Sequence, residues 1–248
     1  MPRSTSRTDS KAQPSELARW KDDPYPQYRD EVNASIAFSG LSVDFFTEGK
    51  ARHLAQLIGA HFGHAATPQC LDVGCGLGAM HPHLQGCVGG LIGVDVSDAA
   101  ISGAAQANPW ASYRKFDGER LPFKDAAFDV AFASCVLHHV EPASRARFMR
   151  EIYRVLRPGG LSVIFEHNPI NPLTRLAVYR CEFDRDAVLL RRREALGLIG
   201  DAGFQSARGR YIFFLPLRSR WARALDDRLG SLALGAQYYV CGTRPGDA

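Results

Sequence analysis

A glycine-rich loop is the feature that most constrains this chain. The stretch Cys70–Gly78 reads Cys-Leu-Asp-Val-Gly-Cys-Gly-Leu-Gly, a short apolar run followed by glycine at every second position. Glycines at this density after a strand usually let the backbone approach a ligand more closely than any side chain permits. A helix beginning just beyond such a turn also points its free N–H groups at that ligand. The loop therefore predicts a strand–turn–helix unit that forms a cofactor site.

The spacing within this loop separates it from two similar loops. Dinucleotide-binding dehydrogenases use G-x-G-x-x-G, and P-loops end in Gly-Lys followed by Ser or Thr. Here the pattern is Asp72-x-Gly74-x-Gly76-x-Gly78, with no Lys-Ser/Thr after it. A second apolar run ends at Asp95, 21 positions after Gly74. Because an acid about 20 residues past the glycines accepts hydrogen bonds from ribose hydroxyls in such units, Asp95 is the predicted ribose ligand.

Composition limits the class of protein. The chain has 248 residues, 46% hydrophobic and 23% charged, which suits one α/β domain with additions. The net charge of +4 is too small to predict a nucleic-acid partner. The six cysteines form no C-x-x-C pair, which favours a reducing, cytoplasmic location. No apolar run reaches the roughly 18–20 residues of a membrane helix, so no membrane span is expected.

The order of patterns predicts three parts. Residues 1–13 lack apolar periodicity and are predicted to form a disordered tail, with a transit peptide as the alternative. Residues 14–66 combine an aromatic-rich stretch with a helical pattern from Ser42 to Phe62, and are predicted to form an N-terminal helical cap. Residues 67–248 form the expected main domain. Its connection at 168–190 exceeds the roughly 2–6 residues usual between strand and helix, so it is predicted to be lid-like.

These elements resemble the motifs of class I S-adenosylmethionine-dependent methyltransferases (methyltransferase type 11/25-like). The resemblance covers about 69–203: the glycine loop, Asp95, the pair Asp117-Gly118 after a third strand, and the turn Leu156-Arg-Pro-Gly-Gly before a fifth. It implies an α/β fold with a Rossmann-like, doubly wound, seven-stranded and mostly parallel sheet whose last strand is antiparallel, besides the N-terminal cap. It also implies S-adenosylmethionine as the cofactor, with Asp117 bound to the adenine amino group. The cofactor-binding residues expected on this basis are Asp72, Gly74, Cys75, Gly76, Gly78, Asp95, Val96, Asp117, Gly118 and Ser134.

Histidines after the fourth and fifth strands are candidate catalytic groups. His138 and His139 follow one strand and His167 ends the other, at the edge where open α/β sheets bind ligands. Each could take a proton from an acceptor or line its pocket, and capping or packing is the structural alternative. Neighbouring side chains on a helical turn point about 100° apart. We therefore do not expect His138 and His139 to face one ligand, and no metal site is predicted.

The acceptor is expected to be a small or lipid-like organic molecule. The aromatic N-terminal stretch and the long connection predict a covered pocket, with candidate lining residues Tyr28, Phe45, Glu166 and Arg175. The stretch Ser134-Cys-Val-Leu lacks the Asn/Asp-Pro-Pro-aromatic motif of DNA amino-methyltransferases, so nucleic acid is disfavoured. The oligomeric state cannot be read from these patterns.

Three alternatives stay open. A carrier-bound or phosphorylated acceptor would suit the arginines of the connection and the run Arg191–Arg193, because arginine binds anions bidentately, although such a run is usually a solvated helix end. A non-catalytic, cofactor-binding regulatory protein would keep the same loop and acids. A nicotinamide-dependent oxidoreductase is opposed by the glycine spacing.

Overall fold

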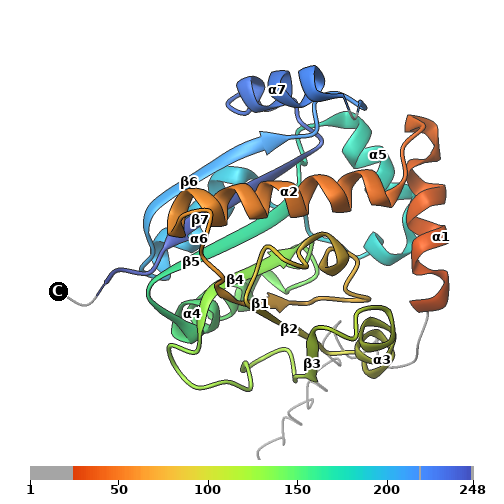
Figure 1. Ribbon diagram of the computed structural model, residues 1–248. Coiled ribbons are helices and arrows are strands. Elements are labelled where there is room, and N and C mark those ends of the chain that lie inside the picture. The colour runs from red at the N-terminus through yellow and green to blue at the C-terminus, as the bar shows by residue number, and fades with distance from the viewer. Residues whose placement is uncertain (1–24, 218, 247–248) are drawn as a thin grey trace, which may run out of the picture.

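Helices cover both faces of a single seven-stranded sheet in the computed structural model, which describes residues 25–217 and 219–246 (Figure 1). The strands lie in the order β3-β2-β1-β4-β5-β7-β6. Pairing is parallel from β3 to β5, whereas β7 runs antiparallel to both β5 and β6. The predicted Rossmann-like sheet with an antiparallel last strand is confirmed. The strands are β1 Gln69–Val73, β2 Gly90–Asp95, β3 Ser112–Lys115, β4 Phe128–Ser134, β5 Leu156–His167, β6 Gln205–Ile212 and β7 Gln237–Thr243.

Two apolar cores form because the central strands are buried on both faces. In β4, Val130 and Phe132 pack on the core that includes α2, whereas Ala131 and Ala133 pack on the core of α4 and α6. This alternation follows from the two-residue period of a strand. The helices are α1 Tyr25–Ile36, α2 Val43–Phe62, α3 Asp98–Ala107, α4 Arg145–Val155, α5 Pro172–Arg180, α6 Arg192–Asp201 and α7 Arg220–Leu229.

The turn before the fifth strand differs from its prediction. Helix α4 ends at Val155 and β5 begins at the next residue. Pro158-Gly159-Gly160 therefore lies inside β5 instead of forming a turn between the helix and the strand. The strand pairs Phe128 with Leu156 and then Val130 with Leu161, so the extra residues form an irregularity in the ladder. A proline disfavours helical backbone in the residue before it, which explains why the helix stops ahead of it.

The edge strand β6 begins earlier than the sequence pattern indicates. The apolar run from Tyr211 predicts a strand there, but β6 starts at Gln205 and ends at Ile212. Its first residues are mostly exposed, because β6 pairs only with β7 and its outer part faces solvent. The nearby Arg191–Arg193 run begins α6 instead of ending a helix. Its Arg192 lies 4.6 Å from the centre of the Tyr211 ring and donates to the carbonyl of Gly209.

The region predicted to form an N-terminal cap and the long connection meet at one end of the molecule. Helices α1 and α5 lie side by side at one end of the molecule (Figure 1). The Arg180 guanidinium at the end of α5 lies 5.4 Å from the centre of the Phe38 ring, which follows α1. Within the connection 168–190 lie α5 and the short helix η5 Glu182–Asp184. Residues 1–24, which include the predicted tail, lie outside the described residues. None of the helices in the described part is long and apolar enough to cross a membrane.

The buried Arg145 joins this connection to the loop after β4. Its Nε donates to the carbonyl oxygens of Leu137 (3.0 Å) and Val140 (3.1 Å), and its Nη2 donates to that of Val188.

An unsatisfied buried acceptor costs roughly 1–3 kcal/mol, so Arg145→Met should lower the free energy of unfolding by about 2–4 kcal/mol. Urea denaturation measures this. The matched control is Arg147→Met on the same helix, whose exposed ion pair with Glu119 should contribute about 0.5 kcal/mol or less.

Equal midpoints for the Arg145→Met and Arg147→Met proteins would contradict this account of the connection.

Candidate functional site

A cavity of about 480 Å³ lies along the carboxyl ends of the parallel strands. Its floor is formed by the loops after β1, β2 and β4, and its roof by α1, α2 and the connection 168–190. In an open α/β sheet this edge is where ligands bind. The predicted cofactor residues that line the cavity are Asp72, Gly74, Cys75, Gly76, Asp95, Val96, Gly118 and Ser134.

The glycine loop has a backbone that only glycine adopts easily. Gly74, Gly76 and Gly78 have φ angles of 75°, 52° and 65°. A Cβ atom on Gly74 would lie 2.6 Å from Val136 Cγ2, and one on Gly78 would lie 2.8 Å from His81 Nδ1. Side chains at these positions would collide with the protein itself, so only glycine lets the loop keep this tight cradle shape. Gly78 contributes to this backbone shape without lining the cavity.

Asp72 sits below the loop in a buried chain of polar groups. Its Oδ2 pairs with His81 Nε2 at 2.9 Å, and His81 Nδ1 pairs with the Tyr113 hydroxyl at 2.7 Å. The other carboxylate oxygen, Oδ1, is buried and has no hydrogen-bond partner within the protein. Because an unpaired buried carboxylate oxygen is costly, this atom favours a ligand that brings a cationic or N–H group.

Asp95 holds the glycine loop as well as facing the cavity. Its Oδ2 accepts from the Gly76 N–H at 2.9 Å, and its Oδ1 accepts from the Ser97 N–H at 3.0 Å. Burial raises the pKa of this carboxyl, and the two backbone N–H groups counter that effect in part. Each oxygen keeps a second lone pair that ribose hydroxyls can use.

Asp117 is placed differently from the other predicted residues. It is exposed and does not line the cavity, whereas Phe116 and Gly118 on either side of it do. Its Oδ1 accepts from the backbone N–H groups of Glu119 and Arg120, which hold the pKa of the carboxyl below its usual range. In this conformation Asp117 shapes the loop after β3, and the adjoining Gly118 presents its backbone to the cavity.

The unpaired Asp72 oxygen, the glycine cradle and Asp95 together fit S-adenosylmethionine. They offer one carboxylate to an amino group, close backbone contact, and a second carboxylate to vicinal hydroxyls. His81, which fixes Asp72, is a residue that the sequence patterns did not reveal, because nothing in its spacing marks it.

Glu166 forms a buried polar cluster at the other end of the cavity. Its Oε1 accepts from the N–H groups of Val136 and Leu137, and its Oε2 lies 2.6 Å from His138 Nδ1. Burial disfavours its charge, but the adjacent His138 more than offsets this and lowers the pKa of the carboxyl. Glu166 was predicted to line the acceptor pocket, and this prediction is wrong. The side chain is fully buried behind the turn after β4, and that turn binds both carboxylate oxygens.

The histidines gather around a residue that the sequence analysis did not single out. His138 Nε2 and His139 Nε2 lie 3.5 Å and 3.4 Å from Asp184 Oδ1, and both rings line the cavity. The expectation that they would point apart is wrong, because the residues form one tight turn rather than a continuing helix. His167 is also present, with its ring centre 5.1 Å from that of His138. Asp184 comes from the long connection, where an isolated acid carries no recognisable signal.

The electrostatic effects differ among these histidines. Burial disfavours charge on His138, yet Glu166 and Asp184 outweigh it and hold its pKa well above the ordinary value. For His139, burial dominates and lowers the pKa, with Asp184 acting in the opposite direction. For His167, burial is outweighed by Cys135, which raises the pKa.

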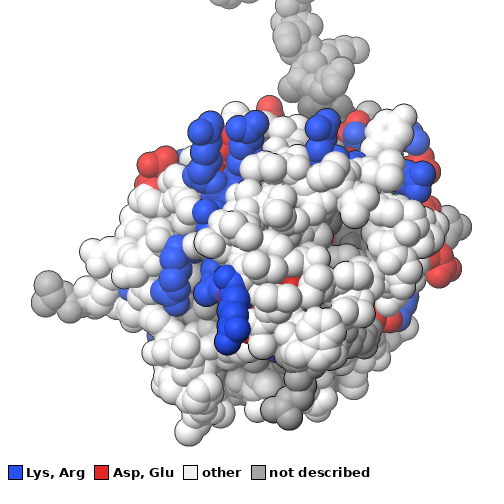
Figure 2. Space-filling model, turned by 90° about the horizontal axis from the view of Figure 1, so that it is seen from above, with Lys and Arg blue, Asp and Glu red and all other residues white. Residues whose placement is uncertain are grey.

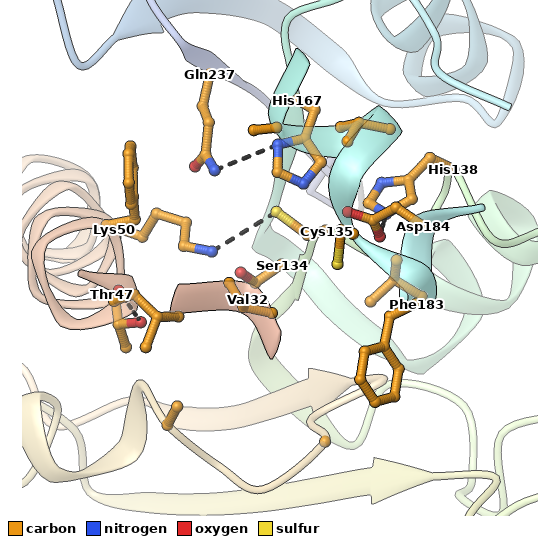
Figure 3. Close-up of a pocket in the computed structure, with 18 of the residues that line it drawn as sticks. Val32, Thr47, Lys50, Ser134, Cys135, His138, His167, Phe183, Asp184 and Gln237 are labelled. Atoms are coloured by element: carbon orange, nitrogen blue, oxygen red, sulfur yellow. Dashed lines mark hydrogen bonds and ion pairs between the residues drawn. The ribbon is translucent and has the colours of Figure 1, made fainter. Parts of the chain in front are cut away.

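Lys50 and Cys135 face each other across the cavity (Figure 3). Lys50 Nζ lies 3.6 Å from Cys135 Sγ, and Cys135 has a φ angle of 59°. Burial raises the pKa of the thiol, but Lys50 and His167 outweigh it and lower the pKa to about 7. The sequence analysis missed Lys50, although its four-residue spacing from Phe46 and Leu54 places it on the apolar face of α2.

Of the remaining predicted acceptor residues, Phe45 lines the cavity and Arg175 lies on the outer surface of the protein. Phe45 lines the cavity and packs against Phe46 and Phe213, with ring centres 5.2 Å and 5.6 Å away. Arg175 is exposed on α5 and does not line the cavity, because it lies on the outer face of that helix. Tyr28 lies in α1, but its side chain is outside the described residues.

Cys135 should react as a thiolate near neutral pH, whereas Cys75, in the same cavity, has a pKa raised by burial and by Asp72 and Asp95. Iodoacetamide in EDTA-containing buffer should label Cys135 with a midpoint near pH 7. Lys50→Met removes the stabilising cation and should slow labelling at pH 7 by roughly tenfold. Mass spectrometry of the labelled peptides provides both rates. Equal labelling of Cys75 and Cys135 would contradict the assignment.

Comparisons with known proteins agree with this geometry. Residues 71–164 match the sequence profile of the methyltransferase domain. An uncharacterised methyltransferase of Synechocystis is 32% identical over 142 residues, covering 56% of this chain and 67% of that protein. A ubiquinone biosynthesis O-methyltransferase of Azorhizobium caulinodans is 27% identical over 71% of this chain and 76% of its own length. The chain spans only 30% and 54% of two further curated relatives.

Solved structures show the same architecture. The crystal structure of an S-adenosylmethionine-dependent methyltransferase from Thermotoga maritima superposes with a TM-score of 0.60. It is 21% identical and covers 89% of this chain and 99% of the other, so it supports the fold. The domain match, the Synechocystis relative and the glycine loop with its two buried acids lead to one conclusion. The chain belongs to the class I S-adenosylmethionine-dependent methyltransferases.

Proposed function

We propose that this protein transfers a methyl group from S-adenosylmethionine to a small or lipid-like organic acceptor. The observation that carries the proposal is the continuity of the cavity. One space connects the glycine loop and Asp95 with the polar cluster around His138 and Asp184. A donor on the glycine loop and an acceptor near the histidines would therefore share one covered chamber, as in-line transfer requires.

The walls of this chamber favour an apolar acceptor. Side chains from the cap and the connection, among them Ile36, Phe45, Val178 and Phe183, line it. Phe38 and Leu173 line it as well and are 40% and 59% exposed, so they form an apolar rim. Mostly apolar walls with a few convergent polar groups are typical of small-molecule sites. The name of the Azorhizobium relative, which refers to ubiquinone biosynthesis, is consistent with an acceptor of this kind.

The outer surface gives similar support. Figure 2 shows the molecule from above: Lys and Arg gather toward one side, and much of the remaining surface is uncharged. Exposed apolar side chains on α5 and α7 include Leu173, Tyr179 and Trp221. We infer an acceptor other than nucleic acid because the stretch after β4 lacks the Asn/Asp-Pro-Pro-aromatic motif of DNA amino-methyltransferases. From the absence of paired-cysteine motifs we infer a cytoplasmic location. A carrier-bound or phosphorylated acceptor is less favoured, because Arg175 and the Arg191–Arg193 run do not line the cavity.

Residues of this chain would perform three tasks. S-adenosylmethionine, when bound, supplies a methyl group on a positively charged sulfur that leaves as a neutral thioether. Asp72, Asp95 and the glycine loop hold that donor, and the cap excludes water. An acceptor hydroxyl would give its proton to a histidine while its oxygen forms the new bond to carbon and the carbon–sulfur electron pair stays on sulfur. His139 is the histidine best placed for this, since its side chain is 25% exposed compared with 1% for His138.

The donor half is tested through Asp95. Asp95→Asn removes a charged acceptor of ribose hydroxyls, so the affinity for S-adenosylhomocysteine should fall about 10- to 100-fold, or roughly 1.5–3 kcal/mol. Isothermal titration calorimetry measures it, with NAD titrated in parallel. The control, Asp98→Asn, changes an exposed carboxylate three residues away and should leave the affinity unchanged.

An unaltered dissociation constant in the Asp95→Asn protein, or tight NAD binding without S-adenosylhomocysteine binding, would refute the donor half of the proposal.

The acceptor half is tested by filling the chamber. Ala177 on α5 lines the cavity, whereas Tyr179 on the same helix is 87% exposed. With methyl-labelled S-adenosylmethionine and a panel of quinols, phenols and phosphorylated analogues, the wild-type protein should label an apolar hydroxylated compound. Ala177→Phe should reduce that labelling at least about tenfold by occupying acceptor space, and Tyr179→Phe should not. Both variants should bind S-adenosylhomocysteine normally.

Labelling of phosphorylated compounds alone would favour the alternative acceptor. If S-adenosylhomocysteine binds but no compound or cell extract yields a labelled product, a non-catalytic regulatory role would replace the proposed activity.

A further inference from the structure

We propose that His138, His167 and Asp184 form a binding site for a divalent transition-metal ion. One ring nitrogen of each histidine and one carboxylate oxygen of Asp184 lie within 4.8 Å of one another. They come from three separate segments: the turn after β4, the end of β5 and the helix η5. Figure 3 shows the two rings and the carboxylate converging on the same corner of the cavity.

His138 is oriented in the way that a metal-binding histidine requires. Its Nδ1 lies 2.6 Å from Glu166 Oε2, so an Nδ1–H donated to this carboxylate leaves the lone pair of Nε2 directed toward the cavity. A histidine bound to metal almost always donates its other ring N–H to a carboxylate or a carbonyl in this manner. Glu166 also accepts from two backbone N–H groups, which fixes its position.

The nitrogen that faces Asp184 lacks a hydrogen-bond partner. His138 Nε2 is buried and makes no hydrogen bond, and its side chain is 1% exposed. It lies 3.5 Å from Asp184 Oδ1. Two ligands at about 2.0–2.1 Å from a tetrahedral zinc ion are roughly 3.4 Å apart, so this separation suits two ligands of one ion. An ion between them would satisfy an atom that the protein alone leaves unpaired.

His167 can be held as the second nitrogen ligand by Gln237. The Gln237 amide nitrogen lies 3.5 Å from His167 Nδ1, while the Gln237 Oε1 is buried and without a partner. Turning the amide by 180° places Oε1 beside Nδ1, where it accepts the Nδ1–H. The other ring nitrogen of His167 is then the ligand atom. Both histidines would have a fixed tautomer.

The donor set points to the class of metal. Two imidazoles and one carboxylate suit zinc, iron(II) or cobalt(II), whereas magnesium and calcium prefer oxygen ligands throughout. Three protein ligands leave at least one coordination position open, and all three residues line the cavity. This position could bind the acceptor hydroxyl and lower its pKa. That use of the ion rests on the proposed function, but the binding of the ion does not.

The test measures metal binding in the absence of donor and acceptor. Full-length, tag-free protein is stripped with a chelator, and Zn²⁺ or Co²⁺ is titrated by calorimetry and by visible absorption. We expect one equivalent to bind, a Co²⁺ spectrum of a site with nitrogen and oxygen ligands, and no competition from excess Mg²⁺. Asp184→Asn and His167→Ala should each weaken binding at least about tenfold, and Glu166→Gln about 10- to 100-fold through its hold on His138.

Two controls separate a lost site from a lost fold. His83→Ala alters an exposed histidine outside the cluster and should bind Zn²⁺ as the wild-type protein does. The Asp184→Asn and His167→Ala proteins should still bind S-adenosylhomocysteine, whose contacts lie at the glycine loop. The proposal is overturned if the wild-type protein binds no stoichiometric Zn²⁺ or Co²⁺, or if Asp184→Asn and His167→Ala bind as tightly as His83→Ala. Either result would leave the proposed methyl transfer untouched.

Discussion

The hydrogen bonds of one buried carboxylate hold the site together. Glu166 at the end of β5 accepts from the N–H groups of Val136 and Leu137 and pairs with His138. These bonds shape the turn after β4, and this turn supplies Cys135, His138 and His139 to the cavity. A buried carboxylate persists only when its oxygens are satisfied, so the turn and the carboxylate depend on each other.

This turn also supports the donor side. A Cβ atom on Gly74 would lie only 2.6 Å from Val136 Cγ2, which belongs to this turn. The turn that Glu166 holds therefore packs directly against the glycine loop, and this close packing requires glycine at position 74. Arg145 adds a third link, from the same turn to the connection 168–190. A structural change at the acceptor end of the cavity can in this way alter the donor end, because the turn after β4 contacts both.

The donor half could be predicted from the sequence because its determinants are local. Strand β1, the glycine spacing and Asp95 lie within 27 residues, and each has a steric or hydrogen-bonding requirement that restricts residue type. The seven-stranded sheet with an antiparallel last strand was implied by the family that these motifs resemble, whereas the order of the strands comes from the structure. Asp117 shows the limit of this reasoning, since a matching position does not determine where a side chain points. Its carboxylate binds the following backbone instead of facing the cavity.

The acceptor half could not be predicted in the same way, because it depends on contacts between distant segments. Asp184 meets His138 across 46 positions of sequence, and Lys50 meets Cys135 across 85. No period or spacing encodes such pairs. The connection 168–190 supplies both the carboxylate of the polar cluster and apolar walls such as Val178 and Phe183. One segment thus determines the shape of the acceptor chamber and the chemistry at its end. Substitutions within it could change the acceptor while the local donor motifs stay intact.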